Sequence, residues 1–380
     1  MPLLFPSSVS QSMNYNELIY RIAFSLIRGN TRVIANELLS RIGSEEEFFN
    51  APSRVLEMLI GKKVKYTDDS YRHQLIERAK QELEFVTKNN IKPIYFKDED
   101  YPQRLTECDD APLILYTLGD CNLNSAHIIS VVGTRHATHY GVDMTERIIE
   151  ELSQRLENLI IVSGLAYGID IAAHRAALKN NIPTIGVLAH GLNTIYPAAH
   201  RNIAADMVKN NGMLITDYTS TDTIHRGNFL ARNRIVAGLC DCILIAESAK
   251  KGGAIVTAGI ADGYNRDVLA LPGRANDPYS HGCNHLIATG RAALITSAQD
   301  IIDTMRWTAK PHEGTQTQLF SDLTEEEQTI MSFIEDNPLS SANEISVGIN
   351  IPFSKLSSTL IDMEFRGLLV NYPGGRYDIS

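Results

Sequence analysis

Short apolar runs alternate with helical stretches from residue 128 onward, and no other feature of the sequence limits the fold as strongly. The runs are rich in Val, Ile and Leu, as buried strands of parallel sheets are. Helical segments, among them residues 140–156 and 169–179, separate the runs. This alternation predicts an α/β fold, a Rossmann-like, doubly wound and mostly parallel sheet that binds ligands at the carboxyl ends of its strands. The expected strands are residues 128–132, 159–162, 184–188, 213–216, 242–246, 268–271 and 293–295.

Smaller segments flank this predicted sheet domain, which we expect over residues 76–305. Residues 14–75 alternate apolar helical stretches with glycine turns, which predicts a helical domain of the SAM or helix-hairpin-helix type. Such a bundle either binds DNA or contacts other proteins. Residues 306–321 are polar, contain Pro and Gly and read as a linker. Residues 322–380 combine three helical stretches with a hairpin, which predicts a winged helix.

The charge of the chain is distributed unevenly. The formal net charge is −10, but residues 301–380 alone hold 12 acidic against 5 basic side chains. Residues 131–300 hold 15 of each. A local cationic site is therefore compatible with an acidic protein, since the distribution of charge matters more than its sum.

Composition narrows the class of protein further. No apolar run approaches the roughly 18 to 20 residues that a membrane span requires. The five cysteines are odd in number, and Cys240 and Cys242 are separated by a single residue. Neither a disulfide framework nor a zinc site fits that spacing. We expect a cytoplasmic protein without membrane contact, metal or cofactor.

Two strand ends resemble phosphate-binding loops. Gly133 and Arg135 follow the first expected strand, and a glycine allows close approach while a guanidinium matches a phosphate. Ser163 and Gly164 follow the second, just before a helix whose free N–H groups favour an anion. The alternative for the first loop is a strand-end glycine with an unrelated surface arginine.

Residues 225–234 (HRGNFLARNR) contain three arginines, one aromatic residue and no acid. Arg226, Arg232 and Arg234 could neutralise successive phosphates, while Phe229 offers a face for an unpaired base. The alternative is that Phe229 is core and that Arg232 or Arg234 forms ion pairs within the fold. Lys250 and Lys251 precede a further glycine turn, without the Gly-Lys-Ser/Thr of a P-loop.

Catalytic machinery is not visible in the sequence. There is no Gly-x-Ser-x-Gly elbow, no Cys/His nucleophile pair and no carboxylate cluster spaced for magnesium. Two alternatives to a nucleic-acid-binding protein remain. One is a Rossmann-fold nucleotide-binding hydrolase of the lysine-decarboxylase-like type, although its Pro-Gly-Gly-x-Gly-Thr loop is missing. The other is a structural adaptor, which leaves the clustered arginines without a role.

Several motifs follow one another along the chain, and together they resemble those of the DNA-processing protein A (DprA/Smf) family over at least residues 95–300. The motifs are Gly133-Thr-Arg135, Ser163-Gly-Leu-Ala-Tyr-Gly-Ile-Asp170, Val187-Leu-Ala-His-Gly-Leu192 with Tyr196-Pro197, Asn228-Phe229 with Arg232-Asn-Arg234, Gly252-Gly-Ala-Ile-Val-Thr257, Leu271-Pro-Gly273 and Ser280-His-Gly-Cys-Asn-His-Leu-Ile287.

The resemblance implies a non-catalytic protein that binds single-stranded DNA. It further implies loading of the RecA recombinase during natural transformation and a homodimer formed through the Rossmann-like domain. Leu286 and Ile287 would belong to the dimer surface. The acidic C-terminal domain favours a protein contact over duplex binding. The positions implied for nucleic-acid binding are Gly133, Arg135, Ser163, Gly164, Arg226, Phe229, Arg232, Asn233, Arg234, Lys250 and Lys251.

Overall fold

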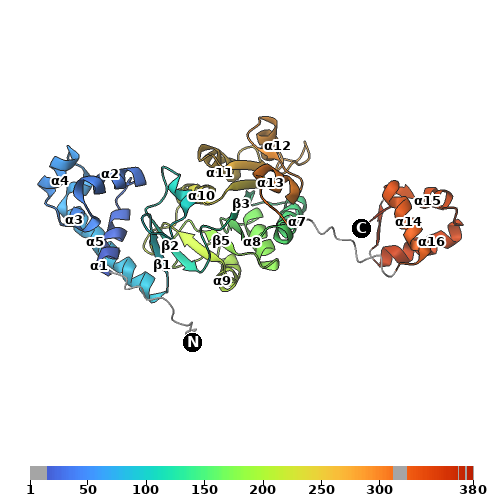
Figure 1. The fold of residues 1–380 in the computed structure, drawn as a ribbon, viewed down its shortest axis with the longest axis horizontal. Coiled ribbons are helices and arrows are strands. Elements are labelled where there is room, and N and C mark those ends of the chain that lie inside the picture. The colour runs from blue at the N-terminus through green and yellow to red at the C-terminus, as the bar shows by residue number, and fades with distance from the viewer. Residues whose placement is uncertain (1–14, 311–322, 367, 373–374, 380) are drawn as a thin grey trace. The chain divides into compact units, whose positions relative to one another are not determined.

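The structure is a computed structural model that describes residues 15–310, 323–366, 368–372 and 375–379 (Figure 1). The chain divides into two compact units, with the division after Lys310, and each is described by itself. Among the described residues, no helix combines the length and the apolar character that crossing a bilayer requires.

A nine-stranded sheet runs through the described part of the first unit, in the order β1-β2-β6-β5-β4-β3-β7-β8-β9. All seven strands predicted from the sequence are present as β3 to β9. Wherever two of these seven strands are adjacent in the sheet, they pair in parallel. The expected α/β fold with a mostly parallel sheet is therefore confirmed. These strands are β3 (His127–Gly133), β4 (Leu159–Ser163), β5 (Thr184–Val187), β6 (Met213–Thr216), β7 (Cys242–Glu247), β8 (Asp267–Ala270) and β9 (Ala293–Leu294).

The strand order reverses beside β3. From β3 the chain builds outward through β4, β5 and β6, and then returns to place β7, β8 and β9 on the other side. Helices that follow β3 and β7 leave the sheet in opposite directions, which opens a crevice at the carboxyl ends of these two strands. Doubly wound sheets bind their ligands at such a switch point.

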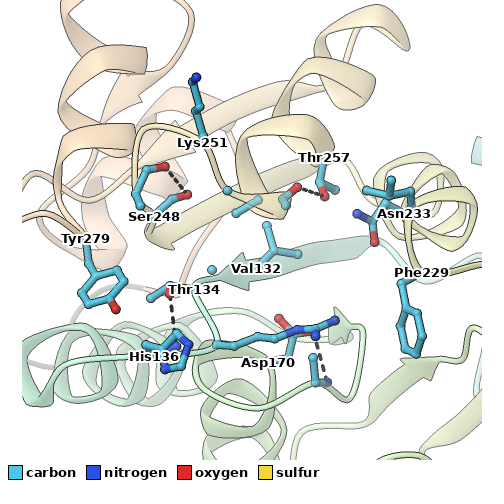
Figure 2. A pocket seen from close by; sticks show the side chains of 18 of the residues that line it. Val132, Thr134, His136, Asp170, Phe229, Asn233, Ser248, Lys251, Thr257 and Tyr279 are labelled. Carbon is cyan, nitrogen blue, oxygen red and sulfur yellow. Dashed lines mark hydrogen bonds between the residues drawn. The ribbon is translucent and has the colours of Figure 1, made fainter. Parts of the chain in front are cut away.

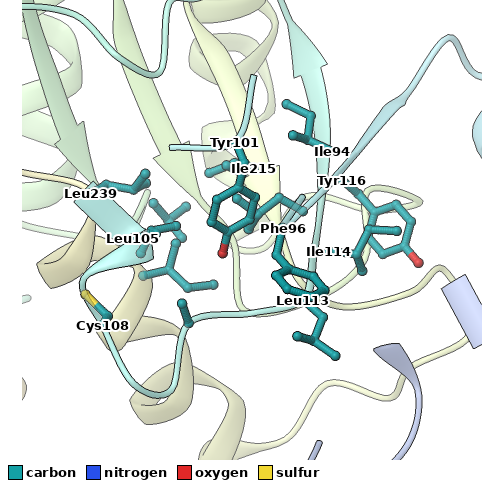
Figure 3. Packing of buried hydrophobic residues seen from close by; sticks show 14 of the residues in the cluster. Ile94, Phe96, Tyr101, Leu105, Cys108, Leu113, Ile114, Tyr116, Ile215 and Leu239 are labelled. Atoms are coloured by element: carbon teal, nitrogen blue, oxygen red, sulfur yellow. The ribbon is translucent and has the colours of Figure 1, made fainter. Parts of the chain in front are cut away.

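Two strands were not predicted. β1 (Lys92–Tyr95) and β2 (Ile114–Gly119) extend the sheet beyond β6 through antiparallel pairing. Figure 3 shows Ile94, Ile114 and Tyr116 near Ile215 of β6, in the core that these strands share. Only the four-residue helix α6 (Gln103–Thr106) separates β1 from β2. So short a helix gives no periodic pattern, and this edge therefore lacks the β-α alternation from which the other strands were predicted.

Helices cover both faces of the sheet. Ile128 and Val132 of β3 face a core with Ile235 and Ala254 of the helices after β6 and β7. Ile129 and Val131 face the opposite core, which contains residues of α7, α8 and α13. The alternation along β3 explains its almost uninterrupted apolar sequence. The helices are α6 (Gln103–Thr106), α7 (His139–Arg155), α8 (Ile169–Lys179), α9 (Arg201–Lys209), α10 (Arg226–Gly238), α11 (Gly253–Gly263), α12 (His281–Ala288) and α13 (Ala298–Met305).

The N-terminal helices lie beside the β1–β2 edge of the sheet (Figure 1). The Tyr95 hydroxyl donates a hydrogen bond to Glu45 at 2.8 Å, and the Ser220 hydroxyl donates to Glu82 at 2.6 Å. The boundary expected between residues 75 and 76 falls within α5, which continues into the sheet unit. The helices are α1 (Tyr15–Ser25), α2 (Arg32–Ile42), α3 (Glu45–Asn50), α4 (Ser53–Ile60) and α5 (Asp69–Lys88).

The second unit contains the three helices and the hairpin strands expected there. Its core includes Ile330, Ile334, Leu356 and Leu360. The assignments as a winged helix and, for α1–α5, as a SAM or helix-hairpin-helix module stay predictions, and most of the expected linker lies outside the described residues. The elements are α14 (Glu325–Asp336), β10 (Ser340–Ser341), α15 (Ala342–Gly348), α16 (Phe353–Phe365), β11 (Leu369–Tyr372) and β12 (Arg376–Ile379).

We expect Ile129→Ala to lower the free energy of unfolding by about 2–5 kcal/mol, because it leaves a cavity in a fully buried strand. The single tryptophan, Trp307, reports on this unit because its ring lies 4.8 Å from His127 of β3. Urea titration followed by Trp307 fluorescence measures the change. The control Val256→Ala, at a side chain 48% exposed, should stay within about 0.5 kcal/mol of the parent. Equal losses in both variants would contradict the assigned core.

We expect His174 to make stability fall with falling pH. Its Nδ1–H donates to the Thr184 hydroxyl at 2.7 Å, since that hydroxyl itself donates to the Ile161 carbonyl. Burial lowers the pKa of His174 to about 3. Below about pH 6.5 the unfolded chain therefore binds a proton at His174 that the folded chain does not bind. This difference lowers the free energy of unfolding by up to about 1.4 kcal/mol per pH unit. His174→Gln should flatten the dependence of urea midpoints on pH between about 6.5 and 4. An unchanged slope would show that His174 protonates freely.

Candidate nucleic-acid interface

A pocket of about 420 Å³ lies at the carboxyl ends of β3 and β7, where the strand order reverses. Figure 2 shows Phe229 and Asn233 at one end of it and His136 and Tyr279 at the other. The residues that line the pocket come from the loop after β3, the start of α8, the first turns of α10, the turn between β7 and α11 and the loop before α12.

Four basic side chains at or near the pocket are exposed. Arg135 follows β3, Arg226 begins α10, and Lys250 and Lys251 lie in the turn before α11. Within the described residues, none of the four forms a salt bridge. The Arg135 guanidinium carbon lies 5.6 Å from the centroid of the half-buried Phe229 ring. This combination presents unpaired positive charge beside an aromatic face.

The start of α11 adds backbone donors to the same pocket. The helix begins at Gly253 after Gly252, and no side chain caps its first turn. Gly252, Gly253 and Ala254 all line the pocket. Because the first N–H groups of a helix have no acceptor within it, this end of α11 favours an anion.

Arg232 lines the pocket, but its guanidinium is bound within the fold. Its side chain is buried, and Nη1 donates to the Gly164 carbonyl at 2.6 Å and also to the Val187 carbonyl. Burial lowers the pKa of the guanidinium, and the charge of Asp170 opposes that shift. A Cβ atom at Gly164 would lie 2.3 Å from Nη1, so only glycine leaves room for this contact. The contacts match the structural alternative for Arg232.

Arg234 is also bound by the protein itself. Its guanidinium forms a salt bridge with Asp217 and donates to the Asp110 carbonyl. The three arginines of residues 225–234 all lie on α10, and two of the three are bound within the fold. Arg226 alone of these three is exposed.

The start of α8 also differs from expectation. The Ser163 hydroxyl is buried and donates to the Val131 carbonyl at 2.6 Å. The Ala166 N–H donates to the Asp170 carboxylate at 3.3 Å. Burial raises the pKa of Asp170, while Arg232 and the backbone N–H groups of Ala166 and Gly164 lower it. The chain's own carboxylate thus occupies the position where we expected a phosphate.

The remaining predicted positions include residues that line the pocket and one that is buried in the core. Gly133 and Asn233 line the pocket. Leu286 is buried in the core of the sheet unit, which leaves its side chain almost no surface for the predicted dimer contact, whereas Ile287 is half-buried. Sequence reasoning missed His136 and Tyr279, whose rings lie 6.1 Å apart at the pocket's edge. Both lie in loops, where periodicity gives no signal.

Relatives of this chain share its central region. The family of DNA recombination-mediator protein A matches residues 92–306. DNA processing protein DprA of Streptococcus pneumoniae is 41% identical over 206 residues, 54% of this chain and 71% of that protein. Protein Smf of Synechocystis sp. is 32% identical over 305 residues, 76% of this chain and 72% of that protein.

Solved structures agree with this relationship. The X-ray structure of DNA processing protein A from Streptococcus pneumoniae matches 71% of this chain and 96% of its own, with a TM-score of 0.57 and 30% identity. DNA processing protein A from Helicobacter pylori, solved to explain its single-stranded DNA binding mode, matches 57% of this chain and 95% of its own, with a TM-score of 0.51 and 31% identity. On the extent of the family match and the identity of these relatives, this chain belongs to the DNA recombination-mediator protein A family.

Proposed function

We propose that the pocket at the β3–β7 switch point binds single-stranded DNA without cleaving it. The observation that carries the proposal is the Arg135 guanidinium, exposed and 5.6 Å from the face of Phe229. Cations beside an aromatic ring suit a strand whose phosphates are neutralised while its bases stack. The relative from Helicobacter pylori, studied for its single-stranded DNA binding mode, supports the same function.

We assign the predicted residues to two groups of roles. The first group binds phosphates directly, because its side chains are exposed, and it comprises Arg135, Arg226, Lys250 and Lys251. Phe229 receives a base, while Gly133 and Asn233 shape the pocket around it. A second group acts from beneath by holding the loops in place, and this group comprises Ser163, Gly164, Arg232 and Arg234.

The wider role that we propose is that of a recombination mediator. Bound in this way, a strand taken up during natural transformation is protected and then transferred to the RecA recombinase in the cytoplasm. We further propose a homodimer through the Rossmann-like domain. The C-terminal unit, as a winged helix, contacts a protein, because Asp362 and Glu364 on α16 oppose binding to duplex phosphates.

We expect Arg135→Glu to weaken oligo-dT binding at least tenfold and to reduce its dependence on salt, because phosphate contacts release counterions. Phe229→Ala should weaken binding about fivefold or more, through lost stacking, with little change in that dependence. Fluorescence anisotropy across a salt series measures both. Lys209→Glu is the matched control, since this exposed lysine ends α9 at the opposite edge of the sheet.

The same titration separates the competing functions. Binding of the parent protein that does not respond to salt, or tight binding of mononucleotides alone, would contradict the strand site. The second result would favour the nucleotide hydrolase instead. Equal losses from Arg135→Glu and Lys209→Glu would show that the pocket is misplaced.

The mediator role predicts a functional coupling to RecA. On single strands already coated with a single-strand-binding protein, adding this protein should shorten the lag before RecA hydrolyses ATP. Arg135→Glu should restore the long lag, because a mediator that cannot hold the strand cannot transfer it. Continuous measurement of ATP hydrolysis reports the lag. An equal effect of the parent and Arg135→Glu proteins would contradict the proposed coupling.

A further inference from the structure

Two tyrosines outside the pocket expose their rings at the same edge of the sheet. Tyr167 lies between β4 and α8 and is 50% exposed, and Tyr196 lies between β5 and α9 and is 51% exposed. Neither belongs to the cores of the sheet unit. Because parallel strands end at one edge, both rings lie on the side of the sheet that carries the pocket.

Contacts between rings connect these tyrosines to the pocket. The Tyr196 and Phe229 centroids are 5.7 Å apart, with an angle of 60° between the ring planes. Tyr167 contacts His200, with centroids 4.8 Å apart, and His200 belongs to the same β5–α9 connection as Tyr196. Aromatic groups therefore continue from Phe229 across the ends of β5 and β4.

Buried histidines hold the loops that carry both exposed rings. His190 accepts a hydrogen bond from the Tyr196 N–H at 3.2 Å and, through Nδ1, donates to the Gly191 carbonyl at 2.9 Å. Burial lowers the pKa of His190, which keeps its Nε2 unprotonated as an acceptor. His200 bonds through Nδ1 to the carbonyl of Leu165, two residues before Tyr167. Loops that are held before binding lose little conformational freedom when a ligand binds.

We propose that Tyr196 and Tyr167 form a stacking rim, which binds the unpaired bases that follow the one at Phe229. This inference rests on the proposed function and adds a path for the DNA strand. Beyond the pocket, the strand lies over the carboxyl ends of β5 and β4. Arg201 is exposed beside His200 and supplies a cation on that path. Unpaired bases suit the rim better than a protein partner, because cations accompany its rings and every base offers a face of the same kind.

A strand that lacks bases tests the rim directly. The parent protein should bind oligo-dT more tightly than an abasic oligonucleotide of equal length, since both carry the same phosphates. Tyr196→Ala and Tyr167→Ala should each weaken oligo-dT binding about fivefold and leave abasic binding unchanged. Tyr196→Phe and Tyr167→Phe keep the ring and should bind as the parent does. Thermal melting of each variant verifies that the fold is retained.

The controls separate failure of the rim from failure of the strand site. Tyr15→Ala removes a ring that is 56% exposed on α1 and should have no effect. Parent-like binding of both alanine variants, with Arg135→Glu still impaired, would overturn the rim and leave the strand site standing. It would also be the result if the rings served a protein partner. Absence of oligo-dT binding by the parent would overturn the proposed function itself.

Discussion

The buried guanidinium of Arg232 is the interaction on which the candidate site depends. From α10 it bonds the carbonyl oxygens of Gly164 and Val187, at the ends of β4 and β5, and so joins three elements beneath the pocket. Asp170 supplies the opposing charge, since a buried cation without one is costly. These bonds hold the ends of β4 and β5 against α10, the helix that carries Phe229. In the proposed function, Arg232 thus contributes to binding through the geometry that it maintains, and the exposed Arg135 contributes charge.

Parallel strands were predictable because burial on both faces imposes an apolar sequence that few other elements share. β3 to β8 follow that pattern, whereas both residues of the short edge strand β9 are exposed, and each of the seven was located to within a residue at either end. β1 and β2 were missed because they join the sheet through antiparallel pairing, and the four-residue α6 between them is too short to show a helical pattern. The doubly wound pattern also predicted a ligand site at the carboxyl ends of the strands, whereas the crevice beside β3 follows from the strand order that the structure shows. Neither result required knowledge of side-chain contacts.

Individual arginines were harder to assign, because a guanidinium suits a phosphate and a buried carbonyl equally well. The helical register of α10 held a usable signal, since Arg232 lies four residues after Asn228 and three before Ile235, both of which are buried. A residue on that face points inward. The phosphate site predicted at the start of α8 was difficult to assess for a different reason. Asp170 lies only one residue into the helix and folds back onto the Ala166 N–H, a contact that no spacing rule distinguishes from a vacant loop.

The central claim is that one strand lies at the carboxyl edge of the sheet, with its bases against Phe229 and the neighbouring rings. Photocrosslinking tests it most directly, with an oligo-dT strand in which single thymines are replaced by 5-iodouracil, an analogue that reacts with adjacent aromatic side chains. Mass spectrometry of the crosslinked peptides then identifies the residues in contact. The account predicts crosslinks at Phe229, with further ones at Tyr196 or Tyr167 as the analogue is moved along the strand. Crosslinks confined to the N-terminal helices or to the C-terminal unit would contradict it.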